Sequence, residues 1–293
     1  MNRFRVTFLS AMLLFASAIS GQDTPKTILW KVEKPNSNYR SYLFGTFHEV
    51  SPFFFDALPN AVSRLQQSDA LFVEARTPDS KQQSIIEPLP WNSVQWKQHL
   101  TPEQALIFAR FVNKAEDSSY YQLNPLLLTL TTSRLYLVNF CNSDSAFPGL
   151  MDSHIEKTAA DLQKPVYSLD GDQHAMLNKE AANLGAEQDA AYLSYSIDFM
   201  RNMLENDLSG CQLVKDYKSF DLNYELEADI SQNASYSSLL VERNRRWTGV
   251  LHHAFSTQNC FVAVGFRHLF YKQGLVQQLR SLGYVVTPVP AGK

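Results

Sequence analysis

The sequence contains few of the signals by which common classes of protein are identified. The three cysteines, Cys141, Cys211 and Cys260, stand far apart, which argues against the closely paired thiolates of a structural zinc site. Runs of lysine or arginine are absent, and the net charge of −3 gives the chain no electrostatic reason to bind nucleic acid. No stretch rich in proline, glycine and serine is long enough to separate two domains. These absences predict a single domain that does not bind nucleic acid.

Three common catalytic motifs are missing as well. The chain has no His-Glu-x-x-His sequence, which excludes the helix of a zincin protease. It also has neither a Gly-x-Ser-x-Gly sequence nor a phosphate-binding glycine loop. The commonest serine hydrolase elbow and nucleotide sites are thereby removed.

Residues 1–20 combine a basic start with an apolar centre. Arg3 and Arg5 precede an apolar run that is short for a bilayer span and that ends in small residues typical of a signal-peptidase site. We therefore expect a signal peptide over 1–20 and a secreted or periplasmic mature chain over 21–293, with no stable membrane span. Loss of the two arginines takes the net charge from −3 to −5. In an oxidising compartment three cysteines leave at least one thiol unpaired, and the sequence does not choose the pairing.

Strand patterns gather at the two ends of the mature chain. They cover residues 28–33, 39–44 and 70–74 near the start and 260–265 and 284–289 near the end, with a short one at 165–170. From Thr101 to about Leu208 the pattern is otherwise helical, and it begins at a capping box with Pro102 in the first turn and Gln104 as the return cap. This order predicts one α/β domain: a mixed β-sheet flanked by helices, with a central helical insertion.

Two of these strands end in the same short motif. Gly45 is followed three residues later by His48, and Gly265 is followed three residues later by His268. Glu74 ends a third apolar strand. Because open α/β sheets bind ligands at the carboxyl ends of their strands, these three side chains are expected in one site. Imidazole can bind a divalent metal or move protons near neutral pH. The alternative is that each histidine is a hydrogen-bonded structural residue.

Two further features bear on this site. Glu49 directly follows His48, but adjacent strand residues point to opposite faces, so Glu49 is the weaker candidate. A helical pattern over 237–256 places Arg243 and Trp247 on one face. The guanidinium of Arg243 could hold a substrate carboxylate or stabilise an oxyanion. Alternatively, Arg243 could belong to a solvated basic face.

Taken together, these stretches resemble the TraB/GumN family, which includes the Tiki-type proteases. The matching positions are Gly45 to His48, Glu74, Asp152, Lys164 to Val166, Arg243-Asn244, Gly265 to Leu269 and Gly274. The chain departs from the family at Phe270-Tyr271, where Pro-Gly is usual, and at Asp170, where glutamate is usual. The resemblance implies an α/β fold built from two related halves, each of which supplies one histidine motif to a common cleft.

The resemblance also implies an activity. Tiki-type members are similar to metal-dependent proteases that use manganese or cobalt, so we expect an exported hydrolase, a peptidase acting on a peptide or small-molecule substrate. His48, Glu74 and His268 would hold manganese or cobalt, with zinc as the alternative, and Arg243 would stabilise the oxyanion. The residues expected to contact substrate are Gly45, Thr46, Asn244 and Gly265.

Three alternatives stay open. Glu74 could be the general base rather than a metal ligand. The same fold could also be a metal-free, esterase-like hydrolase with His48 as the base. From a different class comes a non-catalytic protein that binds a peptide or signal molecule in the same cleft. The sequence assigns neither the substrate nor the oligomeric state.

Overall fold

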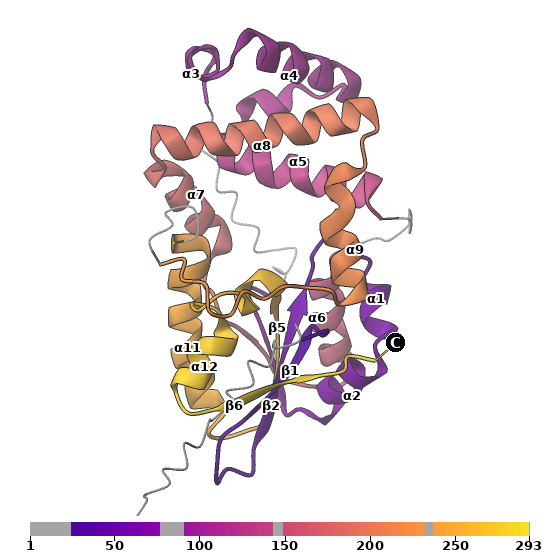
Figure 1. The fold of residues 1–293 in the computed structure, drawn as a ribbon, viewed down its shortest axis with the longest axis vertical. Coiled ribbons are helices and arrows are strands. Elements are labelled where there is room, and N and C mark those ends of the chain that lie inside the picture. The colour runs from indigo at the N-terminus through magenta and orange to yellow at the C-terminus, as the bar shows by residue number, and fades with distance from the viewer. Residues whose placement is uncertain (1–24, 77–90, 143–148, 232–236, 293) are drawn as a thin grey trace, which may run out of the picture.

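A computed structural model of the chain describes residues 25–76, 91–142, 149–231 and 237–292 (Figure 1). The signal peptide expected at residues 1–20 lies outside the described residues. Six strands form one mixed sheet in the order β4-β3-β5-β2-β1-β6. The strands are β1 (Leu29–Glu33), β2 (Arg40–Thr46), β3 (Ala70–Val73), β4 (Val166–Ser168), β5 (Cys260–Gly265) and β6 (Val285–Val289).

Four neighbouring strands of this sheet run parallel. β5 pairs with β2 on one side and with β3 on the other, and β3 pairs with β4, all in parallel register. β1 is antiparallel to both β2 and β6. The carboxyl ends of β2, β5, β3 and β4 therefore meet at one edge of the sheet, where the loops that follow them form a common surface.

Helices lie on both faces of the sheet and also form a separate group beyond its edge. Figure 1 shows α11 and α12 on one side of the sheet and α1, α2 and α6 on the other. The helices are α1 (Phe53–Asp56), α2 (Pro59–Gln67), α3 (Ser93–His99), α4 (Pro102–Ala115), α5 (Pro125–Phe140), α6 (Met151–Asp161), α7 (Gln173–Asn183), α8 (Ala186–Glu205), α9 (Gln212–Ser219), α11 (Arg243–Ala254) and α12 (Leu275–Ser281). Short 3-10 turns η1 (Ser118–Gln122), η2 (Ser209–Cys211) and η4 (Phe266–Leu269) and a π-helical turn η3 (Ser237–Glu242) complete the set.

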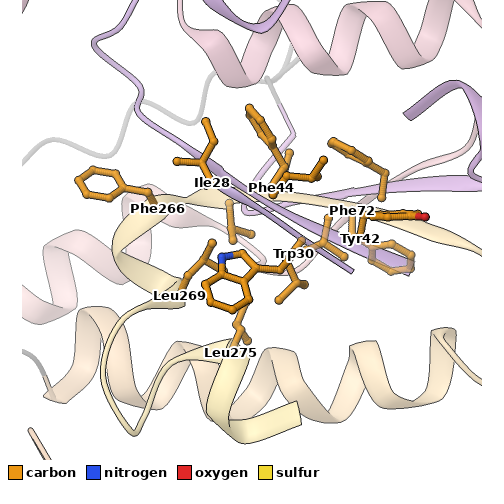
Figure 2. Close-up of a cluster of buried hydrophobic side chains, with 14 of the residues drawn as sticks. Ile28, Trp30, Tyr42, Phe44, Phe72, Phe266, Leu269 and Leu275 are labelled. Atoms are coloured by element: carbon orange, nitrogen blue, oxygen red, sulfur yellow. The ribbon is translucent and has the colours of Figure 1, made fainter. Parts of the chain in front are cut away.

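The larger apolar core lies on the sheet. All but the last residue of β5 are buried, as expected for a central strand that is covered on both faces. Phe44 of β2 packs against Phe55 of α1 and Phe261 of β5, with ring centroids 5.2 and 5.9 Å apart. Figure 2 shows the labelled members Ile28, Trp30, Tyr42, Phe44, Phe72, Phe266, Leu269 and Leu275. Burial of each large side chain stabilises the fold by about 1.5–3 kcal/mol.

A second, smaller apolar cluster lies among α3, α4, α5 and α8. Its fully buried members include Phe108 of α4, Leu128 and Tyr136 of α5 and Met200 of α8. Figure 1 shows these helices stacked beyond the end of the sheet, with α5 between α8 and the sheet. Among the described residues, no helix is long and apolar enough to cross a bilayer.

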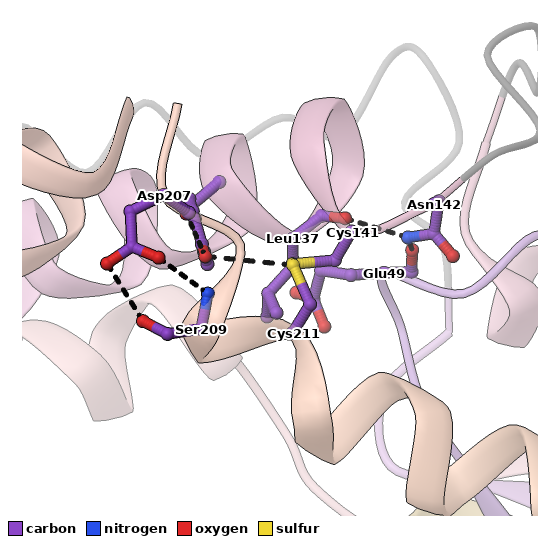
Figure 3. Close-up of a disulfide and its surroundings, with 8 residues drawn as sticks. Glu49, Leu137, Cys141, Asn142, Asp207, Ser209 and Cys211 are labelled. Atoms are coloured by element: carbon purple, nitrogen blue, oxygen red, sulfur yellow. Dashed lines mark hydrogen bonds between the residues drawn. A yellow bond between two sulfur atoms is a disulfide. The ribbon is translucent and has the colours of Figure 1, made fainter. Parts of the chain in front are cut away.

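A disulfide joins the two parts of the molecule. Cys141 follows the end of α5 and is bonded to Cys211, which directly precedes α9 (Figure 3). Next to it, the Asn142 amide donates hydrogen bonds to the backbone oxygens of Glu49 and Leu137, at 2.7 and 2.8 Å. Cys260 is a buried free thiol at the start of β5, and burial raises its pKa to about 12.

The coarse fold prediction is confirmed: an α/β fold with a mixed sheet of six strands flanked by helices. The capping box at Thr101 and Gln104 is also confirmed, with both of its hydrogen bonds present. The two related halves and the insertion remain predictions. The short helices α1, α3 and α9 were not predicted from the sequence, because one or two turns give too little periodicity to recognise.

Candidate functional site

The site begins at the shared carboxyl edge of the four parallel strands. His48 follows β2 by two residues, Glu74 directly follows β3, and Asp170 follows β4. His268 lies in η4, immediately after β5. The parallel pairing of these strands is what brings the four side chains to one edge.

His48 is held by a carboxylate from α6. Its Nδ1 lies 2.5 Å from Asp152 Oδ2, and the other oxygen of Asp152 accepts a hydrogen bond from the Thr46 hydroxyl at 2.7 Å. Because the Nδ1 hydrogen points at Asp152, the Nε2 atom is the one turned toward the space between the strand ends. A hydrogen bond from one ring nitrogen to a carboxylate is the usual way in which proteins orient a functional histidine.

The charges around His48 favour a positive charge on its ring. Burial alone would lower the pKa of His48, but the carboxylates of Asp152, Glu74 and Glu49 outweigh burial and raise it to about 10. The imidazole is therefore protonated at neutral pH in the absence of any other cation. A field that favours a proton at this position also favours a metal cation.

His268 has the opposite character. Its ring is buried, and its Nδ1 lies 2.7 Å from Asn244 Oδ1, while the Asn244 amide donates to the backbone oxygen of Gln273 at 3.0 Å. With the amide so oriented, Nδ1 carries the hydrogen, and Nε2 accepts one from Arg243 Nη1 at 3.2 Å. Burial lowers the pKa of His268 to about 3, so the ring is neutral.

Arg243 is the buried centre of this part of the site. Its Nη2 donates to Glu74 Oε2, and both Nε and Nη2 donate to Asp170 Oδ2, at 2.9 and 2.7 Å. The guanidinium also stacks 4.5 Å from the ring centroid of Trp247, whose indole N–H donates to Asp170 Oδ1 at 2.8 Å. Two carboxylates and an aromatic face thus compensate for the burial of one cation.

Glu74 is ionised in this setting. Burial alone would raise its pKa, but the charges of Arg243 and His48 and the N–H of Gly265, which donates to Oε1 at 2.6 Å, hold the pKa of Glu74 below its usual range. At neutral pH the edge therefore presents an ionised Glu74, a neutral His268 and a positively charged Arg243.

Gly265 marks the point at which these groups meet. A Cβ atom added there would lie 3.0 Å from Glu74 Oε1, 3.5 Å from His48 Nε2 and 3.7 Å from His268 Cδ2. Any side chain at this position would fill the space toward which all three groups turn. The structure therefore brings the two histidine motifs and Glu74 together around one small space.

A cleft of about 840 Å³ opens beside this space. Its walls come from the strand ends after β2 and β3, from the start of α6, from one face of α5 and from α7. His48, Glu74 and Asp152 line it, whereas His268 and Arg243 are buried behind Glu74. Glu49 also lines it, because β2 ends at Thr46 and the alternation of strand side chains no longer applies in the following turn.

The fit of a divalent metal to these residues is partial. His48 Nε2 and the Glu74 carboxylate face the same space and are suitable donors. His268 Nε2, the third expected ligand, accepts a hydrogen bond from Arg243. Within the described ranges, no group of three or more His, Cys, Asp or Glu side chains is arranged to hold a metal ion. The arrangement therefore fits a cation at His48 and Glu74, and His268 can join them only if Arg243 moves.

None of the four residues expected to contact substrate lines the cleft, although Gly265 borders the space between His48 and Glu74. Gly45 is buried, and a Cβ there would lie 2.9 Å from Phe266 Cβ, so it allows β2 to pack closely against η4. Thr46 holds Asp152, Asn244 holds His268, and Gly265 donates its N–H to Glu74. In the structure each of these residues positions a site residue or packs the strand end.

Two acids at the site were not among the expected site residues. Asp152 holds His48, and Asp170 holds Arg243 and Trp247. Asp170 ends a strand pattern just as Glu74 does, so the rule that selected Glu74 would also have found it. Asp152 lies in the first turn of a helix, where acids are common for the local reason of the helix dipole, so its position alone carries no such signal.

Comparison with protein families gives one result for this chain. The family model described as the TraB/PrgY/gumN family matches residues 28–288. This range includes five strands in full, β6 except for its last residue, and every residue of the site described above. Comparisons with curated proteins and with solved structures give no match.

Proposed function

The chain belongs to the TraB/PrgY/gumN family, and from that premise we propose that it is an exported, metal-dependent hydrolase that cleaves peptide bonds. The reaction is assigned to the space between His48, Glu74 and Gly265. The observation that carries the proposal is the convergence of His48 Nε2 and Glu74 Oε1 on one point, which a Cβ at Gly265 would fill.

The surroundings of both histidines support this assignment. Each ring turns its Nδ1 to a side-chain oxygen, that of Asp152 or of Asn244. The Nε2 atom of His48 is thereby left for a ligand, whereas Nε2 of His268 accepts a hydrogen bond from Arg243 and becomes free only if Arg243 moves. This arrangement is the usual outer shell of a metal-binding histidine. A bound divalent ion would lower the pKa of a water molecule and polarise a carbonyl group. Asp152 would keep the His48 ring in place, and Glu74 would hold the water or accept its proton.

The electrostatics count against a metal-free hydrolase with His48 as the base. At neutral pH a histidine whose pKa lies near 10 keeps its proton and cannot take one from water. If a metal cation replaces that proton, the carboxylates of Asp152, Glu74 and Glu49 stabilise the bound metal instead. The electrostatics therefore favour the metal-dependent reaction.

Two finer parts of the proposal rest on other features. Membership of the Tiki-type group is proposed from the paired histidine motifs and Glu74. Export is proposed from residues 1–20 together with the Cys141–Cys211 disulfide, because disulfides persist in oxidising compartments.

The test combines activity with metal content. The mature protein, purified without a histidine tag, would be treated with chelator and then supplied in turn with manganese, cobalt and zinc. Turnover of a mixed library of quenched fluorescent peptides and bound metal would be measured for each sample. We expect turnover to disappear with chelator, to return with at least one metal and to be lost in His48→Ala together with the metal.

His154→Ala provides the matched control, since His154 pairs with Asp56 on the surface of α6 and does not line the cleft. This variant should bind metal and turn over peptides like the wild type. Turnover that is insensitive to chelator, or a wild type that binds no metal and cleaves no peptide, would overturn the proposal.

A further inference from the structure

One face of α5 is apolar and open to the cleft. The face toward α4 and α8 is buried through Leu128, Thr132 and Tyr136. The opposite face lines the cleft with the apolar Leu127, Leu130, Leu135 and Val138, next to the polar Thr131, Ser133, Arg134 and Asn139. A helix that is apolar on both sides is normally covered on both sides.

This face is more exposed than a packed helix face would be. Leu130 is 42% exposed, and Leu127 and Val138 are only half-buried. Leu150, just before α6, and Leu177 of α7 extend the same apolar wall. A concave apolar surface beside a few polar groups is the usual form of a ligand-binding site, and 840 Å³ lies within the usual range of volumes.

The polar groups of the cleft give it a negative charge. Its acidic and basic wall residues are Glu49, Glu74, Asp152, Glu156, Arg76 and Arg134. Among the described wall residues, four carboxylates thus face two guanidinium groups and the protonated His48, which leaves one negative charge in excess. The guanidinium of Arg76 lies 3.4 Å from Glu156. A negative field in a partly enclosed cleft repels anionic ligands and attracts cationic ones.

From these two observations we infer the class of substrate: a peptide that places a large apolar side chain against α5 and carries no negative charge next to it. The inference rests on the proposed function, since the apolar wall and the reacting space belong to one cleft. Leu130 is its central specificity residue, and the surrounding carboxylates select against acidic peptides.

The experiment uses four peptides of equal length that differ at one position, which is Leu, Ala, Lys or Glu. For the wild type we expect kcat/KM to be about tenfold higher for Leu than for Ala, the scale of discrimination by a hydrophobic pocket. At low salt, kcat/KM should be higher for the Lys peptide than for the Glu peptide, and this difference in kcat/KM should shrink at high salt.

Two variants with matched controls separate the apolar and the electrostatic parts. Leu130→Gln should lower the ratio of kcat/KM for the Leu peptide to that for the Ala peptide about tenfold, whereas Leu106→Gln, at a residue 61% exposed on α4, should leave this ratio at its wild-type value. Glu156→Gln should reduce the difference in kcat/KM between the Lys and Glu peptides. Glu103→Gln on α4 should leave this difference unchanged.

Binding of the same peptides, measured by fluorescence anisotropy, keeps this inference apart from the proposed function. If no peptide is cleaved but Leu still binds more tightly than Ala and Glu, and Leu130→Gln removes that difference, the hydrolase proposal fails and the substrate class stands. If Leu, Ala and Glu peptides are bound or cleaved equally, the inferred class is wrong.

Discussion

At the scale of single residues, the two histidines share their geometry and differ in charge. His48 faces three carboxylates and carries a proton, whereas His268 is buried beside the cation of Arg243 and stays neutral. Pairs of titratable groups whose pKa values are moved apart are typical of sites that handle protons or cations.

Asp152→Asn should reduce turnover about ten- to a hundredfold, because the outer-shell partner that orients His48 loses its charge.

The Asp152→Asn change should also alter how the free energy of unfolding depends on pH. A pKa raised from 6.5 to about 10 stabilises the metal-free folded protein fully below pH 6.5, and this stabilisation is lost as the pH rises through 10. The variant should therefore be less stable than the wild type at pH 6, with the difference shrinking above pH 10.

Urea unfolding at both pH values, in the presence of chelator, measures this difference. Asp161→Asn, which removes an exposed carboxylate from the last turn of the same helix, is the control. An equal loss of stability at both pH values would show that Asp152 does not act through the charge on His48.

Arg243→Lys should destabilise the protein by roughly 1–3 kcal/mol, the usual cost of leaving a buried hydrogen-bonding group unsatisfied. Lysine cannot reproduce the planar fork that reaches Glu74 and Asp170 together. Arg245→Lys on the same helix is the control, because its pair with Glu242 is largely exposed and should contribute less than about 1 kcal/mol. Chemical unfolding measures the stability of both variants. Equal unfolding midpoints would contradict the claim that the buried contacts of Arg243 stabilise the fold.

At the scale of elements, the site depends on how closely the strand ends approach η4. Gly45 at the end of β2 lies against Phe266 and Leu269, the residues that flank His268 in η4. The same contact therefore sets the separation between the two histidine motifs.

Gly45→Ala should cost about 1–3 kcal/mol, since its Cβ would meet Phe266 Cβ at 2.9 Å in a packed core. Gly249→Ala is the opposite case: it lies within α11, where a Cβ would meet nothing within 4 Å, and should stabilise by roughly 0.5–1 kcal/mol. Thermal unfolding of the two variants should move in opposite directions. A Gly45→Ala protein as stable as the wild type would show that β2 and η4 do not pack closely at Gly45.

At the scale of the whole molecule, two apolar clusters are joined by a covalent bond. The larger cluster covers the sheet, the smaller one lies among α3, α4, α5 and α8, and Cys141–Cys211 connects α5 to the chain that leads into α9. The cleft lies where α5 faces the end of the sheet, so its shape depends on how the helical group is held.

The double variant Cys141→Ser with Cys211→Ser should lose about 2–5 kcal/mol of stability, because the disulfide closes a loop of 70 residues. Chemical unfolding under oxidising conditions measures this loss. Addition of reductant should destabilise the wild type to a similar degree and leave the double variant unchanged. A wild type that is insensitive to a reductant shown to open its disulfide would contradict this role.

The strands and the motif residues could be recognised from the sequence because their signals are local. An apolar run that ends in glycine or in an acid identifies β2, β3 and β5, and a capping box identifies the start of α4. The same local rules place His48, Glu74 and His268 at strand ends, where the structure has them.

The partners of these residues could not be recognised, because they come from distant positions. Asp152 lies 104 residues from His48, and Glu74 lies 191 residues before the Gly265 N–H that it accepts. Only the pairing of parallel strands and the packing of helices decides such contacts, and no local pattern encodes them. The sequence by itself determined which side chains end the strands. The tertiary structure decided that Arg243 donates a hydrogen bond to His268 Nε2 and that Asp152 binds His48 Nδ1. It also decided that Cys141 pairs with Cys211.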